Sequence, residues 1–231
     1  MSAGPELQLR PDDFSNDAAV ADEVKPRFRG RLHQLACGLS IPAGALLIIV
    51  SRHPSATVAA SIYTASLIVL FGTSAAYHRG RWSPRGRQRM QQLDHGMIFV
   101  LIAGTYTPVT LLALHGTTSI VFLVLAWVCT AAGLTLAVVR FDLLDRYDGY
   151  FYVGFGWLLV LALPAIIPAL TGVELALLFG GGLLYTVGAV GFRLERPDPI
   201  PLVFGYHEVW HTMTLAAAVC HYILVFQLVT S

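Results

Sequence analysis

Seven long apolar stretches constrain the fold of this chain more than any other feature of its sequence. They lie at about 33–51, 55–78, 93–114, 117–139, 150–170, 173–192 and 206–229. Each is close to the roughly 20 residues that a helix needs to cross a bilayer. The connections between them are short, so we expect one compact bundle with no second domain. The sequence therefore predicts an all-α membrane protein, built as a seven-transmembrane helix bundle.

The composition supports this fold class and excludes some functions. The 231 residues are 55% hydrophobic and only 13% charged, whereas a soluble domain carries roughly 25% charged residues. The net charge of +1 gives no reason to expect a nucleic-acid partner. The three cysteines fall in apolar stretches and are odd in number. They are therefore predicted to be small buried side chains rather than a disulfide framework.

The basic residues predict the orientation of the bundle, because cytoplasmic loops of membrane proteins are enriched in Lys and Arg. With a cytoplasmic N-terminus, 14 of the 15 Lys and Arg residues lie on the inner side and only Arg52 lies outside. The inner residues are Arg10, Lys25, Arg27, Arg29, Arg31, Arg79, Arg81, Arg85, Arg87, Arg89, Arg140, Arg146, Arg193 and Arg196. Removing one helix would abolish this asymmetry, so it also favours an odd number of spans. We therefore expect a multi-pass cell-membrane protein with an exterior C-terminus.

The start of the chain differs from the rest in being polar. It contains six acidic residues ahead of a basic cluster. A polar start of this kind predicts that the chain carries no cleavable signal peptide. Residues 1–28 are therefore predicted to be a disordered polar tail in the cytoplasm. Residues 29–231 are predicted to be the seven-transmembrane domain.

Four polar side chains are predicted to lie together at the cytoplasmic end of the bundle. His78 ends the second span, Asp94 lies in the first turn of the third, and the last span begins with His207 and His211. The two histidines of the last span are four residues apart, so they share one face of the helix. Ionisable residues inside a membrane are rare and usually mark a functional site.

These residue types indicate a metal site. The i, i+4 pair His207 and His211 presents two nitrogens to one ion, and His78 would supply a third. Three protein ligands with an open position are typical of catalytic zinc, whereas four closed ligands are typical of structural zinc. Asp94 is either a fourth ligand or the group that holds the metal's water. Ser74 lies one turn from His78 on the same face, within reach of that water.

Each of these residues also has a simpler explanation. A histidine pair at this spacing arises by chance, and a single histidine near a membrane interface usually makes an ordinary hydrogen bond. Asp94 would serve equally as a helix N-cap or as the ion-pair partner of Arg89. Ser74 would bond back to its own helix. The presence of all these residues at one membrane depth favours a common metal site.

The other histidines are expected outside this site. His53 and His115 fall in outer loops, and His33 precedes the first span. His95 points about 100° away from the preceding aspartate around the helix axis. His221 lies roughly 20 Å beyond the start of the last span, which is too far to join the same ion.

Three segments of the chain resemble the hemolysin III family. They are S-A-A-Y-H at 74–78, L-D-H-G-M-I-F-V-L-I-A-G-T-Y-T-P at 93–108, and H-E-V-W-H at 207–211. This family belongs with the progestin and adipoQ receptors, which include the adiponectin receptors. The resemblance covers nearly all seven spans, and it implies a cytoplasmic N-terminus and a Zn2+ ion near the inner face.

The resemblance also implies roles for particular residues. It implies that the metal ligands are His78, His207 and His211, with Asp94 and Ser74 around the zinc-bound water. The sequence departs from the family in one place. Many members carry a Glu and an Asn shortly before a His at the start of the first helix, whereas this chain reads R-F-R-G-R-L-H and only His33 matches.

Two functions of different classes follow. The family is similar to alkaline ceramidases, which implies a zinc-dependent membrane hydrolase whose substrate, a lipid amide or ester, enters laterally between helices. Asp94 would orient the water and accept its proton, and Ser74 would position that water or stabilise the oxyanion. The second hypothesis is a receptor or signalling protein in which zinc is structural. A pore-forming hemolysin is a third, and no ring of charges along any span supports it.

Overall fold

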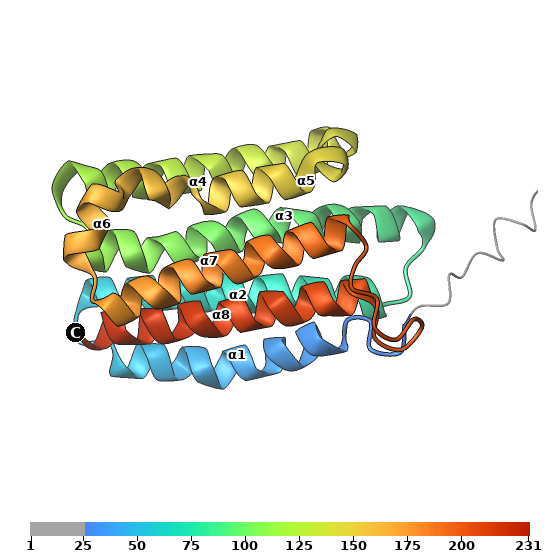
Figure 1. Cartoon of the computed structure of the whole chain (residues 1–231), viewed down its shortest axis with the longest axis horizontal. Helices are drawn as coiled ribbons and strands as arrows, with labels where there is room; N and C mark the ends of the chain where they lie inside the picture. The colour runs from blue at the N-terminus through green and yellow to red at the C-terminus, as the bar shows by residue number, and fades with distance from the viewer. Residues whose placement is uncertain (1–25) are drawn as a thin grey trace, which may run out of the picture.

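Seven membrane-crossing helices form a bundle in the computed structural model, which describes residues 26–231 (Figure 1). The elements are α1 (Arg31–Val50), α2 (Pro54–Arg79), α3 (Pro84–Pro108), the π-helical η3 (Val109–Ala113), α4 (Gly116–Val139), α5 (Phe141–Gly156), the 3₁₀-helical η4 (Leu158–Ala162), α6 (Leu163–Ala169), α7 (Gly172–Arg193) and α8 (Tyr206–Thr230). The third span combines α3 with η3, and the fifth combines α5, η4 and α6. The predicted all-α, seven-transmembrane fold is confirmed, and the protein is a multi-pass membrane protein.

The third span begins earlier than its apolar stretch. Helix α3 starts at Pro84, and the side chain of Ser83 caps it by accepting a hydrogen bond from the Gly86 N–H. Its first two turns are polar and mostly exposed, so a prediction based on hydropathy took them for a loop. Asp94 therefore lies in the third turn of the helix. The prediction that it lies in the first turn was wrong, and Asp94 is not the N-cap.

The fifth span also begins earlier than predicted and is not one continuous helix. Helix α5 starts at Phe141, and its first two turns carry Asp142, Asp145 and Asp148, which interrupt the apolar pattern. The chain tightens into η4 before α6 begins. Pro164 lies in the first turn of α6, where its missing N–H costs no helical hydrogen bond.

The helices pack in an order that places α2, α3, α7 and α8 in the middle of the bundle. Figure 1 shows α4 and α5 along one side and α1 along the other, with those four helices between them. The most extensive contacts join α7 to α8, α1 to α2, and α2 to α3. Gly44 of α1 lies so close to the Thr64 side chain of α2 that a β-carbon there would overlap it. Small residues of this kind let membrane helices approach closely. The three cysteines are free and half-buried.

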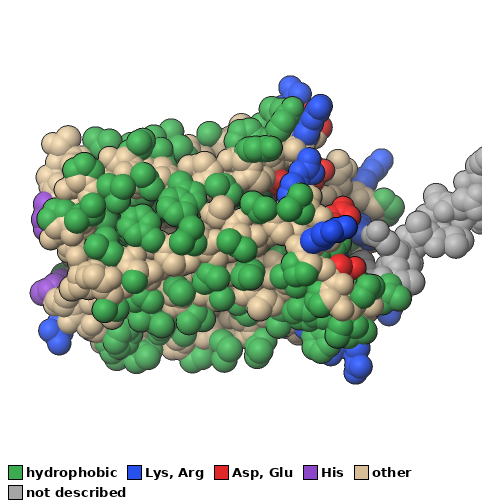
Figure 2. Space-filling model, in the orientation of Figure 1, with side chains coloured by type: hydrophobic (Ala, Val, Ile, Leu, Met, Phe, Trp, Pro, Cys, Tyr) green, Lys and Arg blue, Asp and Glu red, His purple; other side chains and the backbone are tan. Residues whose placement is uncertain are grey.

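Charged side chains gather at one end of the bundle (Figure 2). This end carries the first residues of α1, α3, α5 and α8 and the last residues of α2, α4 and α7. It is the end that the sequence predicts to face the cytoplasm. The chain before α1 is held there, because the backbone N–H groups of Arg27 and Phe28 donate to the carbonyls of Leu202 and Val203. The rest of the predicted tail, residues 1–25, lies outside the described residues.

The orientation yields a first testable prediction. A reporter fused after Ser231 should report the exterior, and one inserted in the short linker between Arg79 and Pro84 should report the cytoplasm. The reason is the concentration of basic residues at one end of the bundle. Protease accessibility or cysteine labelling in inside-out vesicles would measure both positions. A C-terminus on the same side as that linker would contradict the prediction.

Candidate metal centre

Three imidazoles meet at the charged end of the bundle. His78 lies in the last turn of α2, and His207 and His211 lie in the first two turns of α8. One ring nitrogen of each lies within 4.8 Å of the others. The Nε2 atoms of His78 and His207 are 3.2 Å apart. The ring centroid of His211 is 5.2 Å from that of His78 and 4.6 Å from that of His207. The structure thus brings together the three residues that the sequence predicted as ligands.

This donor set fits a zinc ion. Zinc binds imidazole nitrogen at about 2.0–2.1 Å, and two such nitrogens at a tetrahedral angle lie roughly 3.3–3.4 Å apart. The separation between the Nε2 atoms of His78 and His207 is 3.2 Å. The same separation suits a hydrogen bond between two neutral rings of complementary tautomers. The three nitrogens are therefore placed so that a small adjustment would seat one tetrahedral ion.

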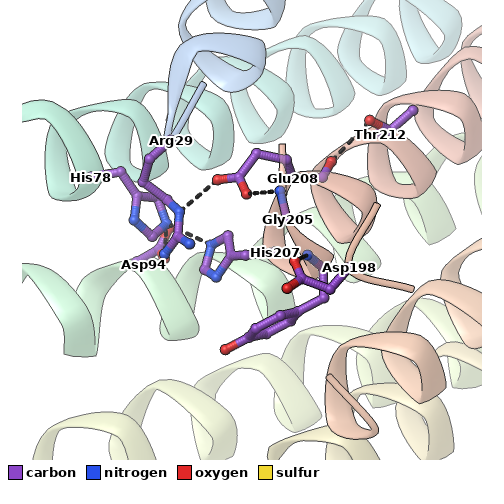
Figure 3. A network of polar contacts seen from close by, with 9 residues as sticks. Arg29, His78, Asp94, Asp198, Gly205, His207, Glu208 and Thr212 are labelled. Carbon is purple, nitrogen blue, oxygen red and sulfur yellow. Dashed lines mark hydrogen bonds and ion pairs between the residues drawn. The ribbon is translucent and has the colours of Figure 1, made fainter. Parts of the chain in front are cut away.

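Asp94 of α3 lies beside His78 (Figure 3). Its Oδ2 atom lies 3.8 Å from Nε2 of His78, the same nitrogen that faces His207. Ser74, buried one turn before His78, interacts with the Asp94 carboxylate. Among the described residues, the group of ligand atoms within 4.8 Å of one another contains only the three histidines. The geometry therefore favours Asp94 as a neighbour of the centre over an equal fourth ligand.

A fourth imidazole, which the sequence analysis left outside the site, joins this cluster. His33 lies in the first turn of α1 and is buried. Its ring stacks on that of His211 with a centroid separation of 3.7 Å and an angle of 16° between the planes. Two signals were available: its match to the histidine that many family members carry at the start of the first helix, and its depth, because α1 begins at the same end of the bundle as α8. Depth alone does not reveal that α1 and α8 are neighbours.

An ion pair fixes the chain before α1 against α8, beside the histidines (Figure 3). Nε of Arg29 donates to Oε1 of Glu208 at 2.6 Å. The Glu208 side chain is fully buried, and that of Arg29 is 21% exposed. The second carboxylate oxygen of Glu208 accepts a hydrogen bond from the Gly205 N–H at 2.9 Å. Both oxygens of this buried carboxylate are therefore engaged: one caps the start of α8, and the other ties α8 to the segment before α1.

A cavity of about 80 Å³ lies against the cluster. Its lining includes His33, Ser74, Asp94, His207 and His211. It adjoins an apolar cavity of about 90 Å³ between α3, α5, α7 and α8, and Ile98, Tyr152, Ala189 and Trp210 line both. A larger space of about 450 Å³ between α5 and α7 shares Asp148 and Arg193 with the first cavity.

The remaining histidines lie outside the group of three ligands. His53 and His115 are exposed in the connections that precede α2 and α4. His95 lines the cavity, but its Nδ1 atom faces Asp148 of α5 at 3.9 Å. His221 lies further along α8, where Nε2 contacts a backbone carbonyl of α7 at 3.2 Å.

Comparison with known proteins identifies the family. A family model described as haemolysin-III related matches residues 22–222, a range that contains every residue of the site. The chain belongs to the haemolysin III family. Hemolysin-3 of Bacillus cereus is 34% identical over 189 residues, which cover 80% of this chain and 83% of that protein. A hemolysin-3 homolog of Bacillus subtilis (strain 168) is 32% identical over 192 residues, covering 80% and 85%. The predicted family resemblance is confirmed.

The ion pair beside the centre of this haemolysin III protein gives a second prediction. Arg29→Ala would leave the buried carboxylate of Glu208 without its cation, and removing one partner of a buried pair costs about 3–5 kcal/mol. We expect a clear fall in the midpoint of thermal unfolding in detergent. Arg27→Ala, two residues earlier at an exposed position, should change it little. Equal shifts in the two variants would show that the pair does not hold α1 to α8.

The geometry of the three imidazoles gives a third prediction. His207→Ala or His211→Ala should lower the zinc content of purified protein far more than His53→Ala or His115→Ala. The reason is that only the first two residues present nitrogens to the common centre. Elemental analysis after exhaustive dialysis would measure the bound zinc. Equal loss in all four variants would point to general destabilisation instead of a metal site.

Proposed function

We propose that this haemolysin III protein is a zinc-dependent integral membrane hydrolase that acts on a lipid amide or ester. The observation that carries the proposal is the meeting of His78, His207 and His211 beside Asp94, next to an apolar cavity within the bundle. Three nitrogen ligands leave a fourth position open, which is the arrangement of catalytic zinc.

Zinc at such a site would lower the pKa of a bound water to about 7 and polarise a carbonyl group. The protein's own contribution begins with Asp94, whose carboxylate lies within 3.8 Å of the ring nitrogen of His78 that faces the centre. From there it would orient a water molecule and accept its proton. Ser74 contacts Asp94 from the neighbouring helix. Its hydroxyl would hold the carboxylate in place or donate to the oxyanion of the substrate.

The reaction can be written with every proton placed. The water oxygen forms a bond to the carbonyl carbon of the substrate, and the water's proton passes to Asp94. The bond from that carbon to the amide nitrogen, or to the ester oxygen, then breaks. The proton held by Asp94 passes to the leaving atom, so the products are a fatty acid and an amine or alcohol. Asp94 ends the cycle as a carboxylate.

The neighbouring cavities favour a lipid as the substrate. The apolar cavity continues from the histidine cavity towards His221 and is lined mainly by aliphatic and aromatic side chains. A lipid with its carbonyl at the histidines would therefore place an acyl chain among apolar side chains. The space between α5 and α7 would be the route of entry from the bilayer, because it shares lining residues with the histidine cavity.

The location of the centre forms part of the proposal. The histidines lie at the end of the bundle that holds almost all basic side chains. By the positive-inside rule this end faces the cytoplasm, so the reaction would take place in the inner leaflet of the cell membrane.

The fourth prediction tests whether the site is a catalyst. Asp94→Asn should keep the fold and the zinc, because the amide is nearly isosteric and the three histidines remain. It should lose turnover by roughly 10²–10⁴-fold, since a neutral amide cannot accept a proton. The measurement is fatty-acid release from a panel of acyl amides and esters in detergent or vesicles, together with zinc analysis of the same sample.

The control for this experiment is Asp142→Asn. Asp142 is exposed and pairs with Arg140 away from the histidines, so its variant should turn over like the wild type. A wild type that binds zinc but cleaves nothing in the panel would contradict the hydrolase. A receptor of the same family with structural zinc would then explain the site.

A further inference from the structure

The stacking of His33 on His211 assigns a role to a residue that lies outside the three ligands. Their ring centroids are 3.7 Å apart, and their planes are inclined by only 16°. Both side chains are buried, with exposed fractions of 4% and 3%. A nearly parallel contact of this kind covers one whole face of the His211 ring.

A histidine that binds a metal needs a fixed ring plane. Such a residue usually donates its second ring N–H to a carboxylate, a carbonyl or water, and this bond sets both tautomer and orientation. The Nδ1 atom of His211 is buried and has no hydrogen-bond partner among the described residues. Among the described residues, no protein group therefore orients His211 through this nitrogen. The flat face of His33 is the contact that the structure provides in its place.

His33 is itself held rigidly. On α2, Phe71 packs beside its ring at a centroid distance of 5.1 Å. Before α1, the backbone at Gly30 approaches the β-carbon of His78 so closely that a side chain on Gly30 would collide with it. The ion pair between Arg29 and Glu208 ties the same segment to α8. The His33 ring is therefore packed against Phe71, and the segment before it is held against α2 and α8.

The ring face, not the ring nitrogens, is the part of His33 that makes this contact. Neither nitrogen of His33 has a hydrogen-bond partner among the described residues. The His33 ring stacks on His211 and packs at a tilt against Phe71, so both contacts are between rings. A residue that supplied only a flat aromatic face would therefore preserve the contact.

We propose that His33 is a positioning residue of the metal centre, and that its ring face fixes the plane of His211 so that His211 presents one nitrogen to the ion. This inference rests on the proposed zinc site and does not depend on hydrolysis. It makes α1 a structural part of a centre whose ligands come from α2 and α8.

The fifth prediction compares His33→Phe with His33→Leu. Both variants lack the nitrogens and fill the space with an apolar side chain, but only Phe keeps a flat ring. We expect His33→Phe to retain zinc affinity close to that of the wild type. His33→Leu should lose roughly 10–100-fold, the usual cost of removing a group that orients a ligand. Affinity would be measured by competition with a chromophoric chelator. The visible absorption of the cobalt-substituted protein would report the coordination geometry, and only the Leu variant should change that spectrum.

The control is Leu47→Ala, which removes a fully buried side chain from the same helix away from the centre. It should lower the unfolding temperature without changing zinc affinity or the cobalt spectrum. Loss of zinc affinity in both His33 variants would overturn the inference, because the ring nitrogens of His33, and not its ring face, would then be needed for zinc binding. Loss in neither, or equal loss in Leu47→Ala, would overturn it as well.

The inference and the proposed hydrolase fail in different ways. In one outcome the wild type binds zinc, with affinity retained in His33→Phe and lost in His33→Leu, yet shows no turnover. That result would contradict the proposed hydrolase and support the role of His33. A wild type that binds neither zinc nor cobalt would overturn both.

Discussion

The lack of water in the bilayer interior is the constraint on which the rest of this structure depends. It requires each span to close its own backbone hydrogen bonds as a helix of about the same length. Spans of 20 to 30 residues joined by short connections begin and end near the two membrane faces. Near one of these faces, the last turn of α2 carries His78, the third turn of α3 carries Asp94, and the first turns of α8 carry His207 and His211. The bilayer thereby collects into one site residues that lie more than a hundred positions apart.

The same constraint explains how charge is handled beside the site. A buried carboxylate without a partner is costly in an apolar surrounding. Glu208 meets this cost with the guanidinium of Arg29 and the N–H of Gly205, and so it serves the packing of α1 against α8. Within residues 26–231, no Lys or Arg pairs with Asp94, which faces His78 and the hydroxyl of Ser74. Two acidic residues near the same end of the bundle therefore differ in their partners: Glu208 is paired with a cation, and Asp94 lies beside His78.

The polar centre and the apolar cavities form a single arrangement. The histidine cavity shares part of its lining with the apolar cavity. Trp210 of α8 lines both, and its sequence neighbour His211 belongs to the group of three histidines. A water-soluble substrate would gain little from such a neighbour, whereas a lipid would match both parts. Membership of the haemolysin III family places this arrangement in a group of membrane proteins, and the names of the Bacillus relatives alone would not have suggested lipid hydrolysis.

The sequence by itself determined the seven spans through hydropathy and the family through its motifs. It also predicted that His78, His207 and His211 share one depth, because hydropathy and helix periodicity fix the depth and the face of a residue. It misplaced the starts of α3 and α5, since polar turns outside the lipid continue a helix without any apolar signal. Only the tertiary structure decided which helices are neighbours. The tertiary structure alone revealed that His33 of α1 stacks on His211 and that Arg29 forms an ion pair with Glu208. The physical reason is that depth is set by each span's own composition, whereas the order of helices around the bundle follows from side chains packing between spans.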